Sequence, residues 1–538
     1  MANEFGIIVV NNVKLPINAS FKEAFSVARA RLSRLGVRVR DEDLYIYRRS
    51  VDARKKNDIY YVYSVACKNC KAPKKEALLA AGMTFASEGE INISKGKNKL
   101  SAPPVVVGTG PCGLFAALLL AEEGYEPVVI ERGGSVEERK RAIDRLKRLR
   151  ILDPDTNVQF GAGGAGTFSD GKLVTRVNDP LVSYVLRRFC EFGAPEEINY
   201  LAKPHIGTDV LSVVVENMLE YIKSRGGKVF YNTKFLSANY SRGKVSSVKT
   251  TRGDIPAGAL ILAIGHSARD TYSTLISEGF HVVAKDFSVG MRIEHKTEDI
   301  DFAMYGDFAG TEGLGHAEYT LSHNTKARGV YTFCMCPGGE VVPAASEEGG
   351  VVVNGMSENA RDAENSNSAV VVSVRREDYG ATPEAAIAFQ RSIERAAFTA
   401  GGSDYSAPII TLGDFLSGKL EREPSRILPS YMGGGVRLAR PESYLPEFVV
   451  DGLRGALPEF DKKIHGFACD DAVLTGAETR TSAPIRILRD NETHLAEGFS
   501  NIYPAGEGAG YAGGITSASI DGIKTALCLM REFSPIKQ

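Results

Sequence analysis

Hydrophobic and polar positions along the first hundred residues predict a small domain of strands and helix. Residues 5–13 alternate in the manner of a β-strand, and hydrophobic residues recur from Phe21 to Leu35 at the spacing of one helix face. Ser20 and Glu23 form a capping box at the start of this helix. Two further strand-like runs and a Lys-rich linker follow at residues 44–51, 59–66 and 94–104. We therefore predict an N-terminal α+β domain over residues 1–98.

From residue 104 the pattern changes to short buried strands that alternate with helices. Residues 105–107 are apolar, a glycine turn follows them, and a helix extends to about Glu123. Thr208 or Asp209 is expected to cap a later helix over residues 208–225. Further strands are expected at 127–130, 228–235, 244–250 and 258–264, a charged helix at 136–150, and a last strand, turn and helix at 500–530. Residues 280–485 mix strands with long loops, so a nucleotide-binding domain interrupted by a second domain would produce this order.

Composition restricts the class of protein. The chain has 538 residues, of which 43 % are hydrophobic and 24 % charged, which argues against a disordered protein. No apolar run reaches the roughly 18 residues that a membrane helix needs, and the first residues lack a signal-peptide pattern. Eight cysteines are too few for a disulfide framework in a chain of this length. These features predict a cytoplasmic protein with no membrane contact. Glycine is in excess, with 55 residues against about 38 expected at average usage.

The excess glycine begins in a G-x-G-x-x-G motif that follows the strand at 105–107. Gly108 permits a tight turn, Gly110 lets the backbone approach a pyrophosphate, and Gly113 lets the helix lie close to the strand. The helix N-terminus offers free N–H groups to phosphate oxygens. Glu131 ends the next strand, where a carboxylate binds ribose hydroxyls. We predict a dinucleotide site formed by Gly108, Gly110, Pro111, Cys112, Gly113, Glu131 and Arg132.

Two later glycine-rich segments favour FAD over NAD as the dinucleotide. Residues 161–171 contain five glycines, and a loop without Cβ atoms can wrap a phosphate or lie against a flavin ring. Near the C-terminus, Glu507 is placed to bind a ribityl hydroxyl, and a helix beginning near Ile515 can stabilise negative charge on the reduced flavin. The predicted contacts in these segments are Gly163, Gly164, Ala165, Gly166, Gly506, Glu507, Gly513, Gly514 and Ile515. Gly265 and Phe235, each expected at the end of a strand, complete the set.

Several long strings identify a family. They are SVDARKK (50–56), the glycine motif of 105–133, NVQFGAGGAGTFSDGKL (157–173), KPHIGTD (203–209), AIGHSARDTY (263–272), GMRIEH (290–295), VYTFCMCPGG (330–339), NGMSENARDAENSNSA (354–369), GAETRTSAPIRI (476–487) and YPAGEGAGYAGG (503–514). Through them the chain resembles, over essentially its whole length, the uncharacterised FAD-dependent dehydrogenases, also called NAD(FAD)-utilising dehydrogenases. Ala162 departs from the Glu that is usual in that family.

The resemblance implies a fold class as well as a cofactor. It implies an α/β protein with a glutathione-reductase-like Rossmann FAD-binding domain and a further family-specific domain. Combined with the hydrophobic pattern, this predicts an FAD-binding domain in two parts, 103–279 and 488–538, separated by a mixed α/β substrate-facing domain at 280–487. The resemblance supplies no substrate.

Polar residues in the segments expected to face the flavin are candidates for catalysis. Lys172, His266, Arg292 and Glu294 are the predicted catalytic residues, because side chains of these types bind anions or transfer protons. Cys334 and Cys336 lie on one face of a predicted strand, at a Cα separation of about 6.6–7 Å that resists a disulfide. Cys67 and Cys70 form a C-x-x-C pair without the second pair that zinc requires, so we expect two unrelated thiols and no metal.

The sequence favours an FAD-dependent oxidoreductase that transfers hydride to or from the flavin. The substrate and the oligomeric state are not specified, and a single G-x-G-x-x-G means that NAD(P)H would bind only transiently. An alternative is a flavoprotein that acts on RNA, because residues 1–100 carry 19 Lys and Arg against 10 Asp and Glu. This basic domain is also able to dock on the acidic remainder of the chain. A third alternative is a redox-sensing FAD-binding protein without catalysis.

Overall fold

The computed structural model describes residues 5–71, 73–86, 89–175, 177–325, 328–431 and 435–536. The chain divides into two compact units. We call the first the N-terminal unit, which comprises Met1–Ile91, Lys172–Ile206 and Glu298–Ala317. We call the second the main unit, which comprises Asn92–Gly171, Gly207–Thr297 and Glu318–Gln538.

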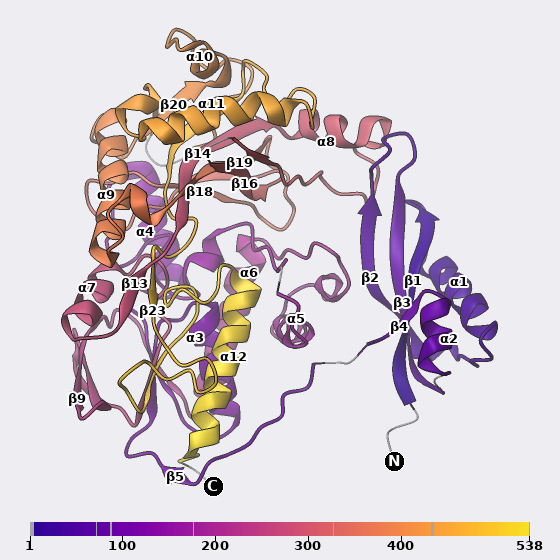
Figure 1. Ribbon diagram of the computed structural model, residues 1–538, viewed down its shortest axis with the longest axis horizontal. Helices are drawn as coiled ribbons and strands as arrows, with labels where there is room; N and C mark the ends of the chain where they lie inside the picture. The colour runs from indigo at the N-terminus through magenta and orange to yellow at the C-terminus, as the bar shows by residue number, and fades with distance from the viewer. Residues whose placement is uncertain are drawn as a thin grey trace. The chain divides into compact units, whose positions relative to one another are not determined.

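The N-terminal unit is built around a four-stranded antiparallel sheet with the order β2-β3-β1-β4 (Figure 1). Helix α1 (Phe21–Ser33) begins after Ser20, whose backbone N–H donates to the Glu23 carboxylate at 2.7 Å, as the predicted capping box requires. The strands are β1 (Phe5–Pro16), β2 (Leu44–Asp52), β3 (Tyr60–Lys71) and β4 (Met83–Ala86), and the helices α2 (Lys75–Ala80) and α5 (Leu181–Glu191) belong to the same unit. The predicted strands and helix of this region are all present.

Cys67 and Cys70 correct one expectation about this unit. They lie near the end of β3 and are joined in a disulfide, whereas the sequence analysis treated them as unrelated thiols. Asn69, between them, adopts a left-handed backbone conformation with φ of 56°, which brings the two cysteines to the same side.

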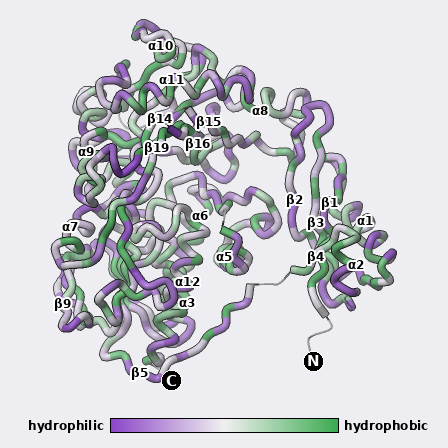
Figure 2. Tube along the Cα trace, in the orientation of Figure 1, coloured by the Kyte–Doolittle hydropathy of each residue, from purple (hydrophilic) through white to green (hydrophobic). Residues whose placement is uncertain are grey.

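The main unit contains a parallel sheet with the order β24-β12-β6-β7-β8. Helix α3 (Pro111–Glu122) follows the central strand and consists almost entirely of apolar residues (Figure 2). Its residues from Cys112 through Ala121 are all buried. Helix α12 (Ile515–Glu532) lies beside α3 although almost 400 residues separate them in sequence (Figure 1). The strands are β6 (Pro104–Val107), β7 (Val128–Ile130), β8 (Lys228–Phe230), β12 (Ala259–Leu262) and β24 (Ile502–Pro504).

A three-stranded antiparallel meander is inserted between β8 and β12. It consists of β9 (Phe235–Ser241), β10 (Lys244–Thr250) and β11 (Gly253–Pro256). The predicted strand at 228–235 is therefore wrong: β8 ends at Phe230, and Phe235 begins β9. Phe235 is 4 % exposed and packs into the hydrophobic core under the parallel sheet.

A seven-stranded sheet with the order β15-β16-β19-β14-β22-β20-β21 forms the remainder of the main unit's core. Its central strand β14 (Phe287–Lys296) is buried along its entire length between β19 (Asn365–Val374) and β22 (Val473–Glu478). The outer strands are β15 (Ser322–Asn324), β16 (Gly329–Cys336), β20 (Ala407–Thr411) and β21 (Val436–Leu438). Helices α9 (Pro383–Ala400) and α11 (Glu447–Asp461) pack against this sheet.

Short elements connect these layers, and two of them differ from expectation. Residues 98–99 within the predicted linker form β5 (Asn98–Lys99), which pairs with β25 (Phe533–Ser534). The N-cap residue of helix α6 (Thr208–Ser224) is Gly207, which has a φ of 80°, and not Thr208 or Asp209 as predicted. The Thr208 hydroxyl instead donates to the Ser169 carbonyl oxygen. The others are α4 (Val136–Leu149), α7 (Arg269–Ser277), α10 (Leu412–Ser417), β13 (Val282–Ala284), β17 (Glu340–Pro343), β18 (Val353–Met356) and β23 (Ile485–Ile487). Helix α8 (Thr297–Tyr305) belongs to the N-terminal unit from Glu298 onward.

Candidate flavin site

The candidate site lies at the carboxyl edge of the parallel sheet. Gly108, Glu131, Gly265 and Gly506 each follow one of four strands, β6, β7, β12 and β24, that end at this edge. Open parallel sheets bind their ligands in the crevice outside this edge. Residues that are almost 400 positions apart in sequence therefore meet at one place, as their motifs predicted.

The turn after β6 has the close backbone packing that its glycines predict. A Cβ atom at Gly108 would lie 2.4 Å from the Ala263 carbonyl oxygen, and one at Gly113 would lie 2.0 Å from the Gly108 carbonyl oxygen. Gly110 is different, because the nearest atom to its added Cβ is the Gly164 Cα, at 3.9 Å. The protein itself thus needs glycine at 108 and 113, whereas the room at Gly110 is a cradle that fits a pyrophosphate.

Glu131 makes contacts that the sequence did not foresee. Its side chain is buried, and one carboxylate oxygen accepts from the Thr109 backbone N–H at 3.0 Å and from the Thr109 hydroxyl at 2.7 Å. The other oxygen accepts from the N–H groups of Gly133 and Gly161, each at 3.0 Å. These four hydrogen bonds use the four lone-pair sites of the carboxylate. Glu131 therefore joins the first glycine turn to the second glycine loop, and a ribose hydroxyl would have to replace one of these donors.

Arg139 holds the second glycine loop from inside. It is completely buried on α4, and its guanidinium donates to the carbonyl oxygens of Asn157, Ala162 and Val158 at 2.8, 2.8 and 2.6 Å. Burial lowers the pKa of Arg139 to about 9. Ala162, the position that departs from the family pattern, thus contributes its carbonyl oxygen to the cation.

The loop held by Arg139 reaches both other glycine segments. Gly164 lies against Gly110, and a Cβ at Gly166 would lie 3.0 Å from the Ile515 side chain at the start of α12. Gly163 and Gly164 have φ values of 83° and 63°, a conformation that favours glycine.

The turn after β24 supplies an acid and a helix N-terminus. The Gly506 N–H donates to Asp521 at 2.7 Å, and Asp521 also pairs with Arg489, which fixes the turn against α12. Gly513 and Gly514, immediately before α12, are exposed, and an added Cβ at either would meet no atom within 4 Å. Burial raises the pKa of Glu507 to about 7, and Lys285 opposes this shift. The open backbone before Ile515 fits the edge of a flavin, whose negative charge on reduction a helix N-terminus stabilises.

Three predicted cofactor contacts have roles within the protein itself. Cys112 is buried, and its sulfur would lie 2.9 Å from a Cβ added at Gly506, so it packs α3 against the turn after β24. Arg132 donates to Asp270 at 2.7 Å, and its guanidinium lies over the Phe160 ring at 4.2 Å from the centroid. Gly265 lies against Gly508, which joins the ends of β12 and β24.

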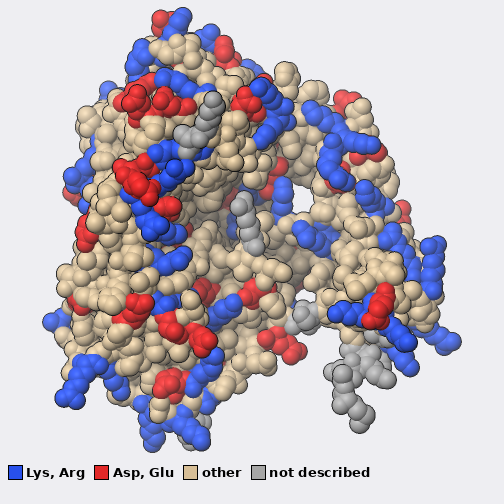
Figure 3. All heavy atoms as spheres, in the orientation of Figure 1, with Lys and Arg blue, Asp and Glu red and all other residues tan. Residues whose placement is uncertain are grey.

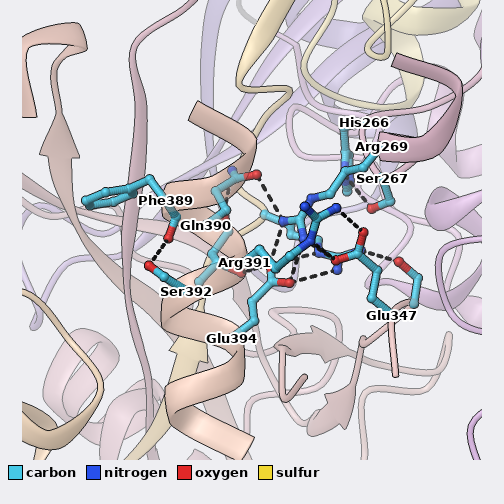
Figure 4. Close-up of polar contacts among 12 residues, drawn as sticks. His266, Ser267, Arg269, Glu347, Phe389, Gln390, Arg391, Ser392 and Glu394 are labelled. Carbon is cyan, nitrogen blue, oxygen red and sulfur yellow. Dashed lines mark hydrogen bonds and ion pairs between the residues drawn. The ribbon is translucent and has the colours of Figure 1, made fainter. Parts of the chain in front are cut away.

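A buried cluster of charged residues adjoins the end of β12 (Figure 4). Arg269 donates to both oxygens of Glu394 at 2.7 Å and to Glu347 at 3.0 Å. Arg480 approaches the same Glu394 carboxylate at 3.1 and 3.2 Å, and Arg391 pairs with Glu347 at 2.8 Å. Burial alone would raise the pKa of Glu394, but Arg269 and Arg480 hold it well below its usual value. This ionic cluster therefore holds three guanidinium groups and two carboxylates.

His266 lies beside the ionic cluster and has no charge at neutral pH. Its Nδ1 lies 2.9 Å from the Ser267 hydroxyl, which also contacts Gln159 at 3.2 Å. Burial, Arg480 and Arg269 together lower the pKa of His266 to about 3. Glu394 and Gln390, which complete the cluster from α9, escaped the sequence analysis. The available signal was their i, i+4 spacing on a helix face that is otherwise apolar.

Arg292 and Glu294 lie side by side within β14, and both are completely buried. Arg292 donates to Glu478 at 3.1 Å and to Asn367 at 2.6 Å, and it also bonds to the Cys334 carbonyl. Glu294 accepts from the Ser430 backbone N–H at 3.0 Å and from the Asn365 amide at 3.0 Å. Burial raises the pKa of Glu294. Hydrogen bonds to the neighbouring strands and to the loop at Ser430 thus compensate for the burial of both charged side chains.

Lys172, the fourth predicted catalytic residue, belongs to the N-terminal unit. There it forms an isolated antiparallel bridge with His205. Its assignment to catalysis stays a prediction.

No helix in the described ranges is long and apolar enough to cross a membrane.

Comparisons with known proteins agree with this geometry. Residues 102–148 match the family described as "FAD binding domain", and residues 286–481 match "FAD-dependent protein, C-terminal domain-like". Residues 7–68 match a domain of unknown function. An uncharacterised protein of Clostridium beijerinckii is 46 % identical over 498 residues, which cover 91 % of this chain and 92 % of that protein.

Among solved structures, two similar chains are an L-amino acid deaminase from Proteus vulgaris and a glycine oxidase from Bacillus cereus. The first is 13 % identical, with a TM-score of 0.33 over 84 % of this chain and 98 % of that one. The second is 10 % identical, with a TM-score of 0.34 over 81 % of this chain and 99 % of that one.

The dinucleotide cradle and the matched families together establish FAD as the cofactor and an FAD-dependent oxidoreductase as the kind of enzyme. The chain belongs to the same family of FAD-dependent proteins as its relative in Clostridium beijerinckii.

Proposed function

We propose that the protein is an FAD-dependent dehydrogenase whose substrate is a small organic anion bound beside His266. The observation that carries the proposal is the meeting of three glycine segments at the carboxyl edge of one parallel sheet, next to the ionic cluster. The parallel sheet with its antiparallel meander is also what a glutathione-reductase-like arrangement requires. When bound, the flavin supplies the site that accepts or donates a hydride.

Each glycine segment is assigned to one part of the cofactor. The turn at Gly108–Gly113 and the N-terminus of α3 would hold the pyrophosphate. The exposed backbone at Gly513 and Gly514, with the N-terminus of α12, would hold the flavin ring. The loop at 163–166 contacts both segments and would close over the cofactor between them.

Two side chains have protonation properties suited to hydride transfer, in which the substrate also gains or loses a proton. Glu507 has a pKa of about 7, so it holds and releases a proton near neutral pH. His266 is neutral, and the contact of its Nδ1 with Ser267 orients the ring. We assign proton exchange to Glu507 and substrate orientation to His266.

The charge of the ionic cluster supports an anionic substrate. Three guanidinium groups face two carboxylates, so the ionic cluster carries a net positive charge. Burial lowers the pKa of Arg480 and Arg269 adds to this shift, whereas Glu394 opposes it. A substrate carboxylate beside Arg480 would balance the net positive charge of the cluster. A nicotinamide donor, if one is used, would bind transiently, because the chain has a single G-x-G-x-x-G.

Anaerobic reduction of the FAD-loaded enzyme tests this function. The flavin absorbance is followed after addition of NADH, NADPH or a panel of organic acids, each acid beside its neutral amide. We expect an acid to reduce the flavin and its amide to fail, and Arg480→Lys to raise the half-saturating concentration about tenfold or more.

Arg395→Gln is the matched control, because Arg395 is an exposed arginine of α9 outside the ionic cluster. It is expected to reduce like the wild type. Equal reduction by acid and amide would overturn the anionic substrate, and a protein that does not retain FAD would overturn the function itself.

A further inference from the structure

The N-terminal unit contains a hollow that the flavin reaction does not use. It has a volume of about 480 Å³, which is within the range of small-molecule sites. Its lining comes from all four strands of the sheet, with one wall from α2 and the turn that follows it. The lining residues are Asn11, Asn12, Arg48, Ser50, Val62, Ser64, Leu79, Gly82, Met83 and Thr84.

Strand register places this lining on one face of the sheet. Arg48 is paired with Ser64, and Ser50 is paired with Val62, so these four residues point to the same side. The neighbouring residues Tyr61 and Tyr63 point to the opposite side, where they are buried and Tyr63 contacts the Phe21 ring of α1. One face of the sheet therefore forms the core with α1, and the other presents a polar floor.

A β-bulge concentrates hydrogen-bonding groups on that floor. Between the pairs Val10–Val65 and Val13–Tyr63, β1 has two residues, Asn11 and Asn12, opposite the single Ser64. Asn12 has a φ of 54°, a left-handed conformation that asparagine tolerates at a cost. Arg31 of α1 donates to the carbonyl oxygens of both asparagines, at 2.9 and 3.3 Å.

Hydrogen bonds across the floor leave donors available to a ligand. Ser64 donates to the Asn11 side-chain oxygen at 3.0 Å, and the Asn11 amide donates to the Thr84 hydroxyl at 3.1 Å. Thr84 thus accepts a hydrogen bond and keeps its own proton. Within the described part of the chain, the side chains of Arg48 and Asn12 have no hydrogen-bond or ion-pair partner.

The electrostatics of the hollow favour an anion. None of its ten lining residues is acidic. The nearest acid along β2 is Asp52, which is paired with Arg54 at 2.6 Å and with Lys14 at 3.5 Å. Lys and Arg side chains also gather over the elements of this unit (Figure 3). Val62 and the half-exposed Leu79 supply apolar surface beside the polar floor.

We propose that this hollow binds a phosphate monoester of a small organic molecule. The Arg48 guanidinium, the Asn12 amide and the Thr84 hydroxyl would bind the phosphate oxygens. The organic part would lie against Val62 and Leu79. All residues of this site belong to the N-terminal unit.

Calorimetric titration of the full FAD-loaded chain tests the proposal, since bound FAD occupies the dinucleotide site. The probes are adenosine monophosphate, ribose 5-phosphate, inorganic phosphate and adenosine. We expect the two esters to bind more tightly than inorganic phosphate, and adenosine to fail. Arg48→Gln is expected to weaken binding about tenfold or more. Asn12→Gly keeps the left-handed backbone without the amide, so it is expected to weaken binding without loss of thermal stability.

Arg38→Gln is the matched control, because Arg38 is an exposed arginine of the same unit outside the hollow. It is expected to leave the affinity unchanged. Absence of ester binding at millimolar concentration would overturn the proposal. Equal weakening by Arg38→Gln and Arg48→Gln would also overturn it, because diffuse charge would then account for binding. Tighter binding of a short single-stranded oligoribonucleotide than of the esters, with a steep dependence on salt, would replace it with a nucleic-acid surface.

Discussion

Arg269 at the start of α7 and Glu394 on α9 form a bidentate ion pair, in which both N–O distances are 2.7 Å and both side chains are almost completely buried. Arg480 approaches the same carboxylate from the segment after β22. One carboxylate therefore ties the end of the parallel sheet to the seven-stranded sheet. The stability of the main unit should depend on this carboxylate more than on any exposed charge.

Replacing Glu394 by glutamine tests that dependence. The substitution keeps the volume but leaves two buried guanidinium groups without their carboxylate, which costs about 3–5 kcal/mol. We expect a clear fall in the urea midpoint of unfolding. Arg391→Gln removes a half-exposed member of the same cluster and is expected to cost no more than about 1 kcal/mol. Equal midpoints for Glu394→Gln and the wild type would contradict the structural importance of the pair.

Substitutions in the first glycine turn distinguish a glycine that the fold requires from a glycine that FAD binding requires. A Cβ at Gly113 would lie 2.0 Å from a carbonyl oxygen of the protein, so Gly113→Ala is expected to lower thermal stability even without FAD. A Cβ at Gly110 is accommodated by the protein, with the nearest atom at 3.9 Å. Gly110→Ala should therefore fold normally and lose FAD affinity about tenfold or more, because its methyl group occupies the place of the pyrophosphate.

Both variants are measured by the thermal midpoint of the flavin-free chain and by FAD titration. Gly513→Ala is a useful third variant, because the added Cβ meets no protein atom within 4 Å. It is expected to fold normally and to alter the flavin spectrum. Unchanged FAD affinity in Gly110→Ala would mean that the pyrophosphate lies elsewhere.

Local patterns in the sequence predicted the parts of this structure that depend on neighbouring residues. The capping box at Ser20, the strand and turn before α3 and the glycine segment before α12 each lie within about twenty residues, and all are present. Parallel strands end at one edge, so the convergence of the glycine segments also followed from their order. Local patterns failed where a distant partner decides, as at Gly207, whose conformation replaces the predicted side-chain cap of α6.

Glu131 and Glu394 show why the contacts of the site were harder to predict. Glu131 lies where the motif places it, but its oxygens accept from Thr109, Gly133 and Gly161, which are up to 30 residues away. Glu394 meets Arg269 across 125 residues. Such pairs depend on tertiary packing, which hydrophobic periodicity does not encode. The buried position of a charged residue on an apolar helix face was the available signal.

Cys334 and Cys336 are predicted to remain thiols through flavin turnover. Cys336 is completely buried, and its contact with Cys334, together with burial, raises the pKa of its thiol well above the usual value. A raised pKa suppresses the thiolate that disulfide exchange requires. We expect the number of titratable thiols to be equal in the oxidised and reduced enzyme. Iodoacetamide should modify Cys336 only after unfolding, as mass spectrometry of the peptide reports. Loss of two thiols on oxidation and their return on reduction would demonstrate a redox dithiol instead.

Glu507 should make stability fall as pH rises from about 5 to 8. Burial raises the pKa of its carboxyl from 4.5 to about 7, so the folded chain retains the proton over a range in which the unfolded chain has lost it. The stabilisation is complete below the unfolded pKa and is lost as pH rises through 7, by up to about 3 kcal/mol and less for a partly exposed group.

Glu507→Gln removes the titrating group. The difference in urea midpoint between variant and wild type, measured on the flavin-free chain, should therefore grow with pH in favour of the variant. Glu492→Gln changes an exposed carboxyl of the same unit and should leave the pH dependence of the wild type in place. Parallel curves for Glu507→Gln and the wild type would show that Glu507 is ionised throughout, and the proton exchange assigned to it would then need another residue.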